Sequence, residues 1–179
     1  TGEDTLSLHD ALPIFDPRLS WADVEWIKKR WGGKLILKGI QDLEDAHLAV
    51  ESGADALIVS NHGGRQLDGA PSSISALPEI ADAVGNRIEV HMDGGVRSGQ
   101  DVLKAVALGA RGTYIGRSFL YGLGAMGEEG VTKALQIIAR ELDLTMAVCG
   151  NRELREFTLR LPRAHRPRRK RAQDRPNAA

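Results

Sequence analysis

The chain has 179 residues, of which 42% are hydrophobic and only 4% are aromatic, so it can form one ordinary domain with a core of aliphatic side chains. Its single cysteine, Cys149, excludes an internal disulfide and suits the reducing cytoplasm. No apolar stretch approaches the ~20 residues that cross a bilayer, and no secretory signal is visible. We therefore expect a cytoplasmic protein rather than a secreted or membrane-spanning one.

The balanced total of 24 basic and 24 acidic residues hides a basic carboxyl-terminal tail. Residues 160–179 hold eight of the basic residues and one acidic residue, which leaves a net charge of −7 for residues 1–159. Such a tail could attract nucleic acid or an anionic membrane surface. Its prolines and its lack of apolar spacing instead favour a disordered, solvated extension, so we expect no nucleic-acid partner.

The amino-terminal residues 1–14 show no convincing hydrophobic period, and we assign them no catalytic role. The regular pattern begins at Ser20. Ser20 and Asp23 form a capping-box sequence that predicts a helix, and Gly32-Gly33 should end it. The apolar side of this helix is predicted to consist of Val24, Ile27 and Trp31.

From residue 34 onward, apolar runs of strand length alternate with helical patterns. Four strands that alternate with helices predict parallel βαβ units in an α/β fold. The predicted strands cover residues 34–39, 56–60, 87–93 and 112–117, and the predicted helices cover residues 42–51, 77–85, 99–108 and 128–142.

Each predicted strand ends in a polar or charged group next to glycine. In a parallel α/β structure the carboxyl ends of the strands share one rim, where TIM barrels assemble their sites. A doubly wound sheet also places its chemistry at strand ends, so the periodicity alone leaves both folds open. A TIM barrel typically needs ~250 residues, and these strands would supply half of one. The four strand ends are Lys38-Gly39, Ser60-Asn61-His62-Gly63, Asp93-Gly94 and Gly116-Arg117.

His62 and Arg65 follow the second strand and suggest chemistry on a small acid. Histidine is the side chain best suited to accept and return a proton near neutral pH. The planar guanidinium of Arg65 suits a bidentate grip on a carboxylate, and Gly63-Gly64 allow a sharp turn between the two residues.

Glycines and arginines at the next two strand ends predict a phosphate site. Glycines let backbone amides approach an anion, and arginines add charge-assisted hydrogen bonds. TIM barrels often bind phosphate at the loops after strands 7 and 8. Either motif alone would be typical of a tight turn, whereas the two together favour a phosphate-bearing ligand. The motifs are Asp93-Gly94-Gly95-Val96-Arg97 and Gly116-Arg117.

The stretch from Asn61 to Asp68, Asn-His-Gly-Gly-Arg-Gln-Leu-Asp, resembles the signature of the FMN-dependent α-hydroxy-acid oxidases and dehydrogenases. The resemblance extends from about residue 15 to about residue 157 and covers only the C-terminal half of such a protein. It implies strands 5–8 of a TIM (β/α)8 barrel with their helices. On this basis residues 1–14 are an out-of-family segment, residues 15–159 form the half barrel and residues 160–179 form the tail.

The resemblance also implies roles for single residues, with FMN as the cofactor and no metal. His62 corresponds to the catalytic base, and Arg65 to the arginine that binds the substrate carboxylate. Lys38 matches the lysine beside the N1/C2 carbonyl edge of the flavin, where a fixed cation favours the anionic reduced form, and Ser60 resembles a contact to the flavin ring. The ribityl and phosphate contacts correspond to Asp93, Gly94, Gly95, Val96, Arg97, Gly116 and Arg117.

The reaction that this resemblance implies is the oxidation of an L-2-hydroxy acid, with L-lactate expected, to the 2-keto acid. His62 would remove a proton, FMN would take up the reducing equivalents, and oxygen, quinone or a cytochrome would accept the electrons. The resemblance also implies homo-oligomers for the full-length relatives, and contact with the inner face of the membrane for some of them. The alternatives are a non-catalytic barrel fragment with two exposed sheet edges and a basic-tailed binding module.

Overall fold

The computed structural model describes residues 18–154, which are built around a four-stranded parallel sheet. Each strand pairs with the next strand in the chain, in sequential order. A doubly wound sheet reverses its strand order at a switch point, whereas consecutive parallel neighbours are the pattern of a barrel wall. The topology therefore favours the barrel. The strands are β1 (Ile36–Ile40), β2 (Ala56–Val59), β3 (Glu89–Met92) and β4 (Gly112–Thr113).

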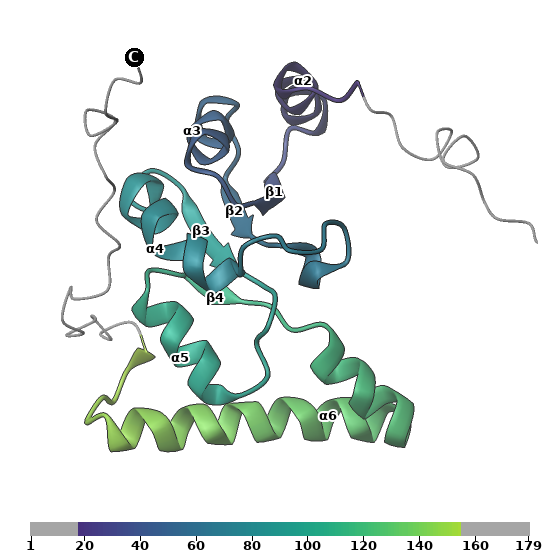
Figure 1. Cartoon of the computed structure of the whole chain (residues 1–179), viewed down its shortest axis with the longest axis vertical. Helices are drawn as coiled ribbons and strands as arrows, with labels where there is room; N and C mark the ends of the chain where they lie inside the picture. Colours follow the sequence, from purple (N-terminus) through teal and green to yellow (C-terminus); the bar gives the residue numbers. More distant parts are fainter. Residues whose placement is uncertain (1–17, 155–179) are drawn as a thin grey trace, which may run out of the picture.

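Helices follow the strands in strict alternation. Helices α3, α4 and α5 lie one after another along one side of the sheet, α2 precedes β1, and the long α6 follows β4 (Figure 1). This arrangement confirms the predicted βα units. A 3-10 turn, η1 (His62–Gly64), lies in the loop between β2 and α4. The α-helices are α2 (Trp21–Trp31), α3 (Leu43–Glu51), α4 (Ser73–Val84), α5 (Gly99–Ala107) and α6 (Arg117–Val148).

The predicted start of the helix after β2 is wrong. Helix α4 begins at Ser73 rather than at Leu77, so Pro78 lies inside the helix instead of in its first turn. A proline there removes one amide of the helical ladder. The apolar side of α4 outweighs this loss, because Leu77, Ile80 and Val84 are buried.

The predicted fourth strand and the last helix also differ from the structure. Strand β4 has two residues instead of six, because its pairing with β3 ends at Thr113, and α6 begins at Arg117. Helix α6 then continues to Val148, beyond the predicted range of 128–142. Its backbone is non-helical at Met126 and Gly127, so two helical segments meet there at a kink. The sequence pattern detected only the segment after this kink.

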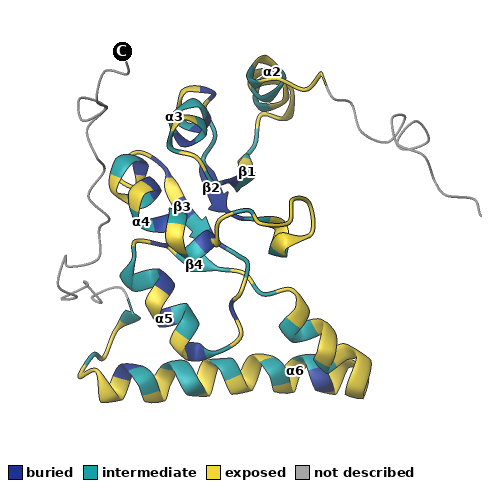
Figure 2. Ribbon diagram, in the orientation of Figure 1, coloured by how far each residue is buried: buried dark blue, intermediate teal, exposed yellow. Residues whose placement is uncertain are grey.

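The hydrophobic core lies between the sheet and the helices α3, α4 and α5, and Figure 2 shows β2 at its centre. Alternate residues of β2 and β3 enter this core, and burying each large aliphatic side chain stabilises the fold by about 1.5–3 kcal/mol. The intervening residues point to the opposite face, which positions the strand-end polar groups away from the core. The core includes Leu57, Val59, Val90 and Met92 from the sheet, and Ala46, Ala49, Leu77, Ile80, Val84 and Ala105 from the helices.

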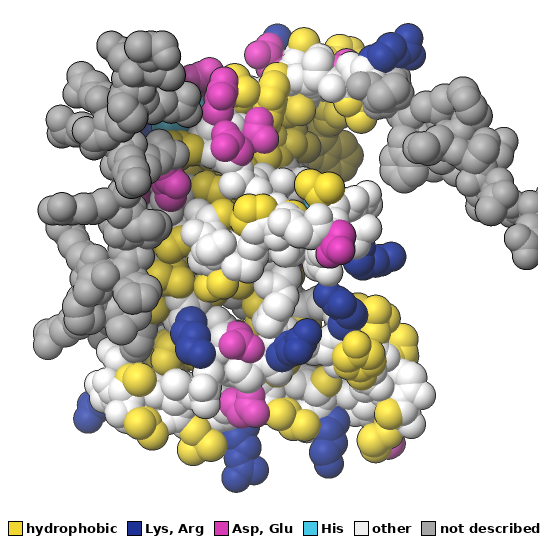
Figure 3. All heavy atoms as spheres, in the orientation of Figure 1, with side chains coloured by type: hydrophobic (Ala, Val, Ile, Leu, Met, Phe, Trp, Pro, Cys, Tyr) yellow, Lys and Arg dark blue, Asp and Glu magenta, His cyan; other side chains and the backbone are white. Residues whose placement is uncertain are grey.

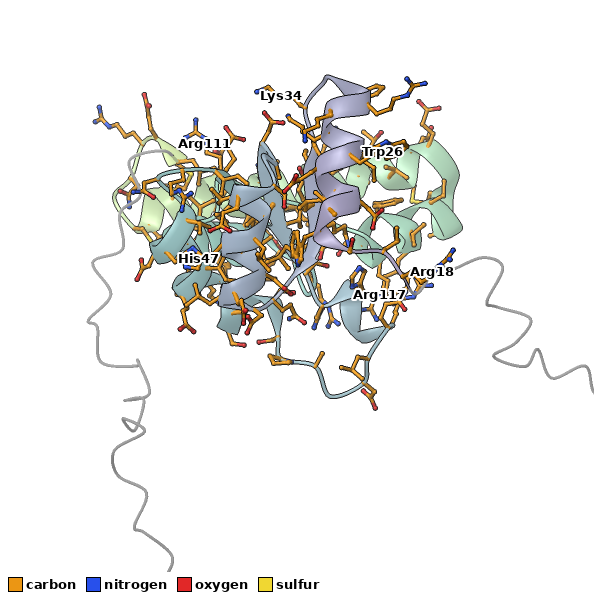
Figure 4. The ribbon with its side chains drawn as sticks, turned by 90° about the horizontal axis from the view of Figure 1, so that it is seen from above. Arg18, Trp26, Lys34, His47, Arg111 and Arg117 are labelled. Atoms are coloured by element: carbon orange, nitrogen blue, oxygen red, sulfur yellow. The ribbon has the colours of Figure 1, made fainter. Side chains whose placement is uncertain are left out.

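Helix α2 has the predicted ends but little cover for its apolar side. The amide of Ser20 donates to Asp23 Oδ2 at 2.7 Å, and Gly32 ends the helix in a left-handed conformation, as the capping box and the glycine pair predict. Trp26 and Trp31 are 65% and 69% exposed, and Ile27 is 41% exposed (Figure 4 labels Trp26). Of the three tryptophans in α2, Trp21 packs against the core. The described residues therefore leave most of this side open.

Asp55, which precedes β2, attaches α2 to the sheet. Its carboxylate pairs with the Nζ atom of Lys28 from α2 and, at 2.7 Å, with Nζ of Lys34, and it accepts the amide of Leu35 at 2.9 Å. The hydrogen bonds from Lys28 and Lys34 are the main reason that the pKa of Asp55 lies well below its usual range. The same contact raises the pKa of Lys34, whose side chain is labelled in Figure 4.

The surface carries both charged and apolar regions (Figure 3). Acidic side chains gather over α3, where Glu44 and Asp45 occupy the first turn and complement the positive end of the helix dipole. Hydrophobic side chains lie near the kinked end of α6, where Leu120, Tyr121 and Met126 are exposed. This part of α6 follows the predicted phosphate motif directly.

The terminal segments 1–14 and 160–179, which we expect to be an out-of-family segment and a basic tail, lie outside the described residues. Within residues 18–154, none of the helices is long and apolar enough to cross a membrane.

Replacing Asp55 with asparagine should release α2 before the sheet unfolds. All three tryptophans lie in α2, so tryptophan emission reports on this helix while far-UV circular dichroism reports on the whole fold. We expect Asp55→Asn to lower the urea midpoint followed by emission more than the midpoint followed by dichroism. Because folding lowers the pKa of Asp55, its ion pairs contribute fully above the ordinary value of 3.8 and are lost as the pH falls below it. The difference between the two proteins should therefore disappear in acid.

Lys29→Gln is the matched control on the same helix, because Lys29 makes only an exposed contact of 3.9 Å with Glu25. This variant should leave both midpoints unchanged. An unchanged emission midpoint in Asp55→Asn would show that Asp55 does not hold α2 in place.

Candidate functional site

Lys38, Ser60 and Asp93 meet at the carboxyl ends of three neighbouring strands. The Nζ atom of Lys38 lies 3.1 Å from Asp93 Oδ2 and donates to Ser60 Oγ at 3.1 Å. A bulge at Gly39 shifts the register of β1 against β2 directly after Lys38. Such bulges often redirect a side chain next to a functional site. The three residues belong to different βα units, so only the pairing of β1, β2 and β3 brings them together.

One oxygen of Asp93 has no partner among the described residues. Its Oδ2 atom pairs with Lys38, whereas its Oδ1 atom is buried and accepts no hydrogen bond. Buried carboxylate oxygens without partners are rare because the desolvation penalty is not compensated. This oxygen therefore suits a ligand that brings a hydroxyl or amide donor to the strand ends.

His62 lies in a strained left-handed turn. Its φ angle is 55°, and among the described residues no other non-glycine residue has a positive φ. Gly63 and Gly64 continue the turn with φ angles of 69° and 73°. A non-glycine residue in this region costs of order 1–3 kcal/mol and tends to mark a functional site. The sequence Asn-His-Gly-Gly permits the turn, because only its first two residues carry side chains.

Hydrogen bonds to Ser60 and Asn61 hold this turn. The amide of His62 donates to Ser60 Oγ at 3.1 Å, and the amide of Gly63 donates to Asn61 Oδ1 at 3.0 Å. Ser60 is only 1% exposed. Its hydroxyl oxygen therefore accepts from both Lys38 and the His62 amide, and it joins the charged strand end to the histidine loop.

The imidazole of His62 lies against the backbone of Gly39. A Cβ atom at Gly39 would come within 2.7 Å of His62 Cε1, and the φ angle of Gly39 is 104°. Glycine at this position is thus needed both for the backbone conformation and for the space that the ring fills. Sequence reasoning missed this role, although the pair Lys38-Gly39 at a strand end was a usable signal.

The two phosphate motifs differ in their free hydrogen-bonding capacity. At the start of α5, the amides of Arg97 and Ser98 donate to Asp101 Oδ2, and the amide of Gly99 donates to Glu141 Oε2 at 2.9 Å. The start of α6 has no such side-chain cap. The first amides of α6 and the positive end of its helix dipole are therefore available to an anion at Gly116-Arg117. The first amides of α5 are already bound to carboxylates.

The predicted site residues line one cavity of about 350 Å³, with the exception of Ser60, which is buried and bonded to Lys38. Lys38 and His62 form part of its wall, and Arg65 lies exposed in the same lining. Val96 is 4% exposed, and its carbonyl accepts a hydrogen bond from the Ser118 hydroxyl at 3.0 Å, which links the two phosphate motifs. The remaining predicted residues in the lining are Asp93, Gly94, Gly95, Arg97, Gly116 and Arg117.

Tyr114 is a lining residue that sequence reasoning missed. It lies two residues beyond Gly112, and alternate residues of a strand point to the same face, so Tyr114 shares the face of the strand-end groups. This two-residue period could have identified Tyr114 from the sequence. Its ring lies 5.7 Å from that of His91, and His91 Nε2 lies 3.2 Å from Glu89 Oε2. His91 therefore packs within the sheet face.

Comparison with known proteins identifies close relatives. The sequence profile of the family described as FMN-dependent dehydrogenase matches residues 4–163. An L-lactate dehydrogenase of Caulobacter vibrioides (strain NA1000 / CB15N) is 55% identical over 140 residues, which cover 78% of this chain and 37% of that protein. An L-lactate dehydrogenase of Actinobacillus pleuropneumoniae serotype 5b (strain L20) is 50% identical over 144 residues, which cover 80% and 38%.

Solved structures show the same relationship. A mandelate oxidase with benzoyl-formic acid is 46% identical, with a TM-score of 0.72, and the match covers 74% of this chain and 40% of that one. A mandelate oxidase variant with a monooxide FMN adduct matches equally well. The chain therefore spans about two-fifths of the length of these relatives. Its four strands and their helices form the C-terminal half of a TIM barrel, which confirms the predicted fold.

Removing the Lys38 ammonium should destabilise the strand ends by leaving Asp93 without its partner. The Asp93 side chain is 18% exposed and that of Lys38 is 43% exposed, so we expect Lys38→Met to lower the free energy of unfolding by only about 1 kcal/mol. Urea denaturation measures this loss. The double variant Lys38→Met/Asp93→Asn should lose less than the sum of the single variants, because it leaves no unpaired carboxylate. Strict additivity would show that the two groups are not coupled.

Proposed function

This chain belongs to the FMN-dependent dehydrogenase family, and from that premise we propose that it forms half of an active site that oxidises an L-2-hydroxy acid to the 2-keto acid. One observation carries the proposal. A left-handed turn, a sheet bulge and two strand ends bring His62, Lys38 and Asp93 to one cavity, which Arg65 also lines. In the proposed function these residues serve as a base, a fixed cation, an open acceptor and a carboxylate-binding group at one rim.

The residues at this rim fit FMN. The unpaired Asp93 Oδ1 atom suits a ribityl hydroxyl, and the uncapped start of α6 with Arg117 suits the phosphate. Lys38 would hold the flavin edge that becomes negative on reduction, with Ser60 fixing the direction of its ammonium group. When bound, FMN supplies the acceptor for the two electrons that leave the hydroxy acid.

His62 and Arg65 would divide the work on the substrate between them. Arg65 binds the carboxylate and thereby orients the carbon that carries the hydroxyl group. His62 accepts one of the two protons that the hydroxy acid loses, and the other hydrogen would leave with the two electrons to the flavin. His62 later releases its proton to solvent. The strained turn fixes the backbone of His62, and its imidazole lies close to Gly39, which reduces the ordering that proton transfer would otherwise require.

L-Lactate is the proposed substrate, because the relatives with that name reach 55% identity while the mandelate oxidases reach 46%. Both names denote 2-hydroxy acids, so the same pair of groups would serve either compound. Oxygen, a quinone or a cytochrome is the proposed electron acceptor. We propose that the protein is cytoplasmic, and the alternative is attachment to the inner face of the membrane. We also expect the complete protein to form homo-oligomers.

The non-catalytic fragment is the second candidate, and the sheet edges favour it. Among the described residues, β1 and β4 each have one neighbouring strand, and Ile36 of β1 is 47% exposed. Unpaired edges and open apolar positions favour association over a defined site. Flavin binding distinguishes the two candidates.

The visible spectrum of the purified chain with FMN tests the proposed function. We expect a bound flavin band that bleaches when L-lactate is added without oxygen. His62→Ala should keep the band but slow its bleaching by about 10²–10⁴-fold, because the base is lost while the FMN contacts remain. A chain that retains no flavin would be the non-catalytic fragment, although its family membership would stand.

Arg65→Lys tests the carboxylate-binding group separately. Lysine keeps the charge but loses the bidentate fork, so we expect half-maximal bleaching to require roughly tenfold more L-lactate, with FMN affinity unchanged. Gln66→Ala is a suitable neighbouring control, because Gln66 lines the same cavity without a positive charge. Equal effects of the two substitutions would remove Arg65 from its proposed role.

A further inference from the structure

Arg117 reaches from the start of α6 to the histidine loop. Its Nη2 atom donates to the carbonyl oxygen of Gly63 at 2.9 Å, across 54 residues of sequence. Figure 4 shows Arg117 beside the loop that follows β2. A Cβ atom on Gly63 would approach the same Nη2 atom to 3.0 Å, so the guanidinium lies directly against the backbone of the turn.

This contact is a second attachment of the strained turn, in addition to the bond to Ser60. Ser60 Oγ accepts the amide of His62 on one side, and Arg117 binds the carbonyl of the next residue on the other. The peptide group before His62 is therefore bound to the end of β2, and the peptide group after Gly63 is bound to the segment that follows β4. Such external contacts are what keep a non-glycine residue at a φ angle of 55°.

The Arg117 guanidinium can hold the loop and an anion at the same time. It carries five N–H donors in a planar fork, and the bond to Gly63 uses one nitrogen. Arg117 is also the first residue of α6, where the helix start lacks a side-chain cap. A phosphate bound there would immobilise the Arg117 side chain. Forming the bond to Gly63 would then cost less side-chain entropy, so the bond would be more stable.

We propose that Arg117 is a positioning residue for His62 and that it couples occupancy of the phosphate site to the order of the histidine loop. The meaning of this coupling for catalysis rests on the proposed function, in which His62 is the base. The coupling itself concerns only the loop and a phosphate anion. Coupling is reciprocal, so whatever orders the loop also favours the anion.

Arg97 provides the matched comparison. It lines the same cavity and is exposed like Arg117. Among the described residues, however, no hydrogen bond joins its guanidinium to the loop from His62 to Arg65. A lysine at either position keeps the positive charge beside the phosphate site, but only the change at Arg117 removes a bond to Gly63.

Amide hydrogen exchange in the full chain, measured by NMR without FMN, tests the proposal. The amides of residues 62–65 all donate hydrogen bonds, to Ser60 Oγ, Asn61 Oδ1, Asn61 O and His62 O, so their exchange reports opening of the turn. The core amides of Leu57 and Val90 serve as the internal reference. The unmodified chain, Arg117→Lys and Arg97→Lys are each measured with and without inorganic phosphate.

We expect Arg117→Lys to accelerate exchange of the loop amides about tenfold relative to the core amides, with no response to phosphate. The unmodified chain and Arg97→Lys should exchange their loop amides at the same slower rate. Phosphate should slow this exchange several-fold further in both, but Arg97→Lys should require a higher phosphate concentration. Equal acceleration in both variants would overturn the proposal, because it would show only a general loosening.

The unmodified chain also tests the proposal without any substitution, which covers the case that Arg117→Lys does not fold. Loop exchange that is indifferent to saturating phosphate would overturn the coupling. This failure is distinct from that of the proposed function, which is decided by flavin binding and bleaching.

Discussion

The ion pair between Lys38 and Asp93 is the interaction on which the arrangement of the site depends. It joins the first and third strands across the buried Ser60 of the second, at a distance of 3.1 Å. Parallel strands expose their carboxyl ends at one rim, and charged groups there must be paired or left to solvent. Here the pairing leaves one carboxylate oxygen open and directs a cation toward the cavity, so the same contact supports the rim and prepares it for a ligand.

The left-handed turn at His62 shows how local strain and long-range contacts combine. The sequence Asn-His-Gly-Gly makes the turn accessible, but His62 itself remains in a costly conformation. Ser60, Gly39 and Arg117 offset this cost from three other segments, through a hydrogen bond, an open space and a guanidinium contact. The base of the proposed reaction is therefore positioned by the sheet as a whole.

The open parts of the molecule follow from the same barrel geometry. The sheet of four strands buries one face under α3, α4 and α5, whereas β1 and β4 each have only one neighbouring strand among the described residues. Trp26 and Trp31 on α2 are exposed, because this helix is attached to the sheet mainly through the ion pair between Lys28 and Asp55 rather than through its apolar side. This chain spans about two-fifths of the length of its relatives.

The sequence by itself determined the alternation of strands and helices, the capping box at Ser20 and the polar strand ends, because these depend on local periodicity and local hydrogen bonds. It also marked the residues of the cavity through their place after each strand. It misjudged α4 and α6, where burial outweighs the cost of Pro78 and a kink interrupts the pattern. Only the tertiary structure decided that Lys38 pairs with Asp93, that Gly39 makes room for His62 and that Arg117 reaches Gly63. These contacts join residues that are 23 to 55 positions apart, and the order and register of the sheet, rather than any local preference, bring them together.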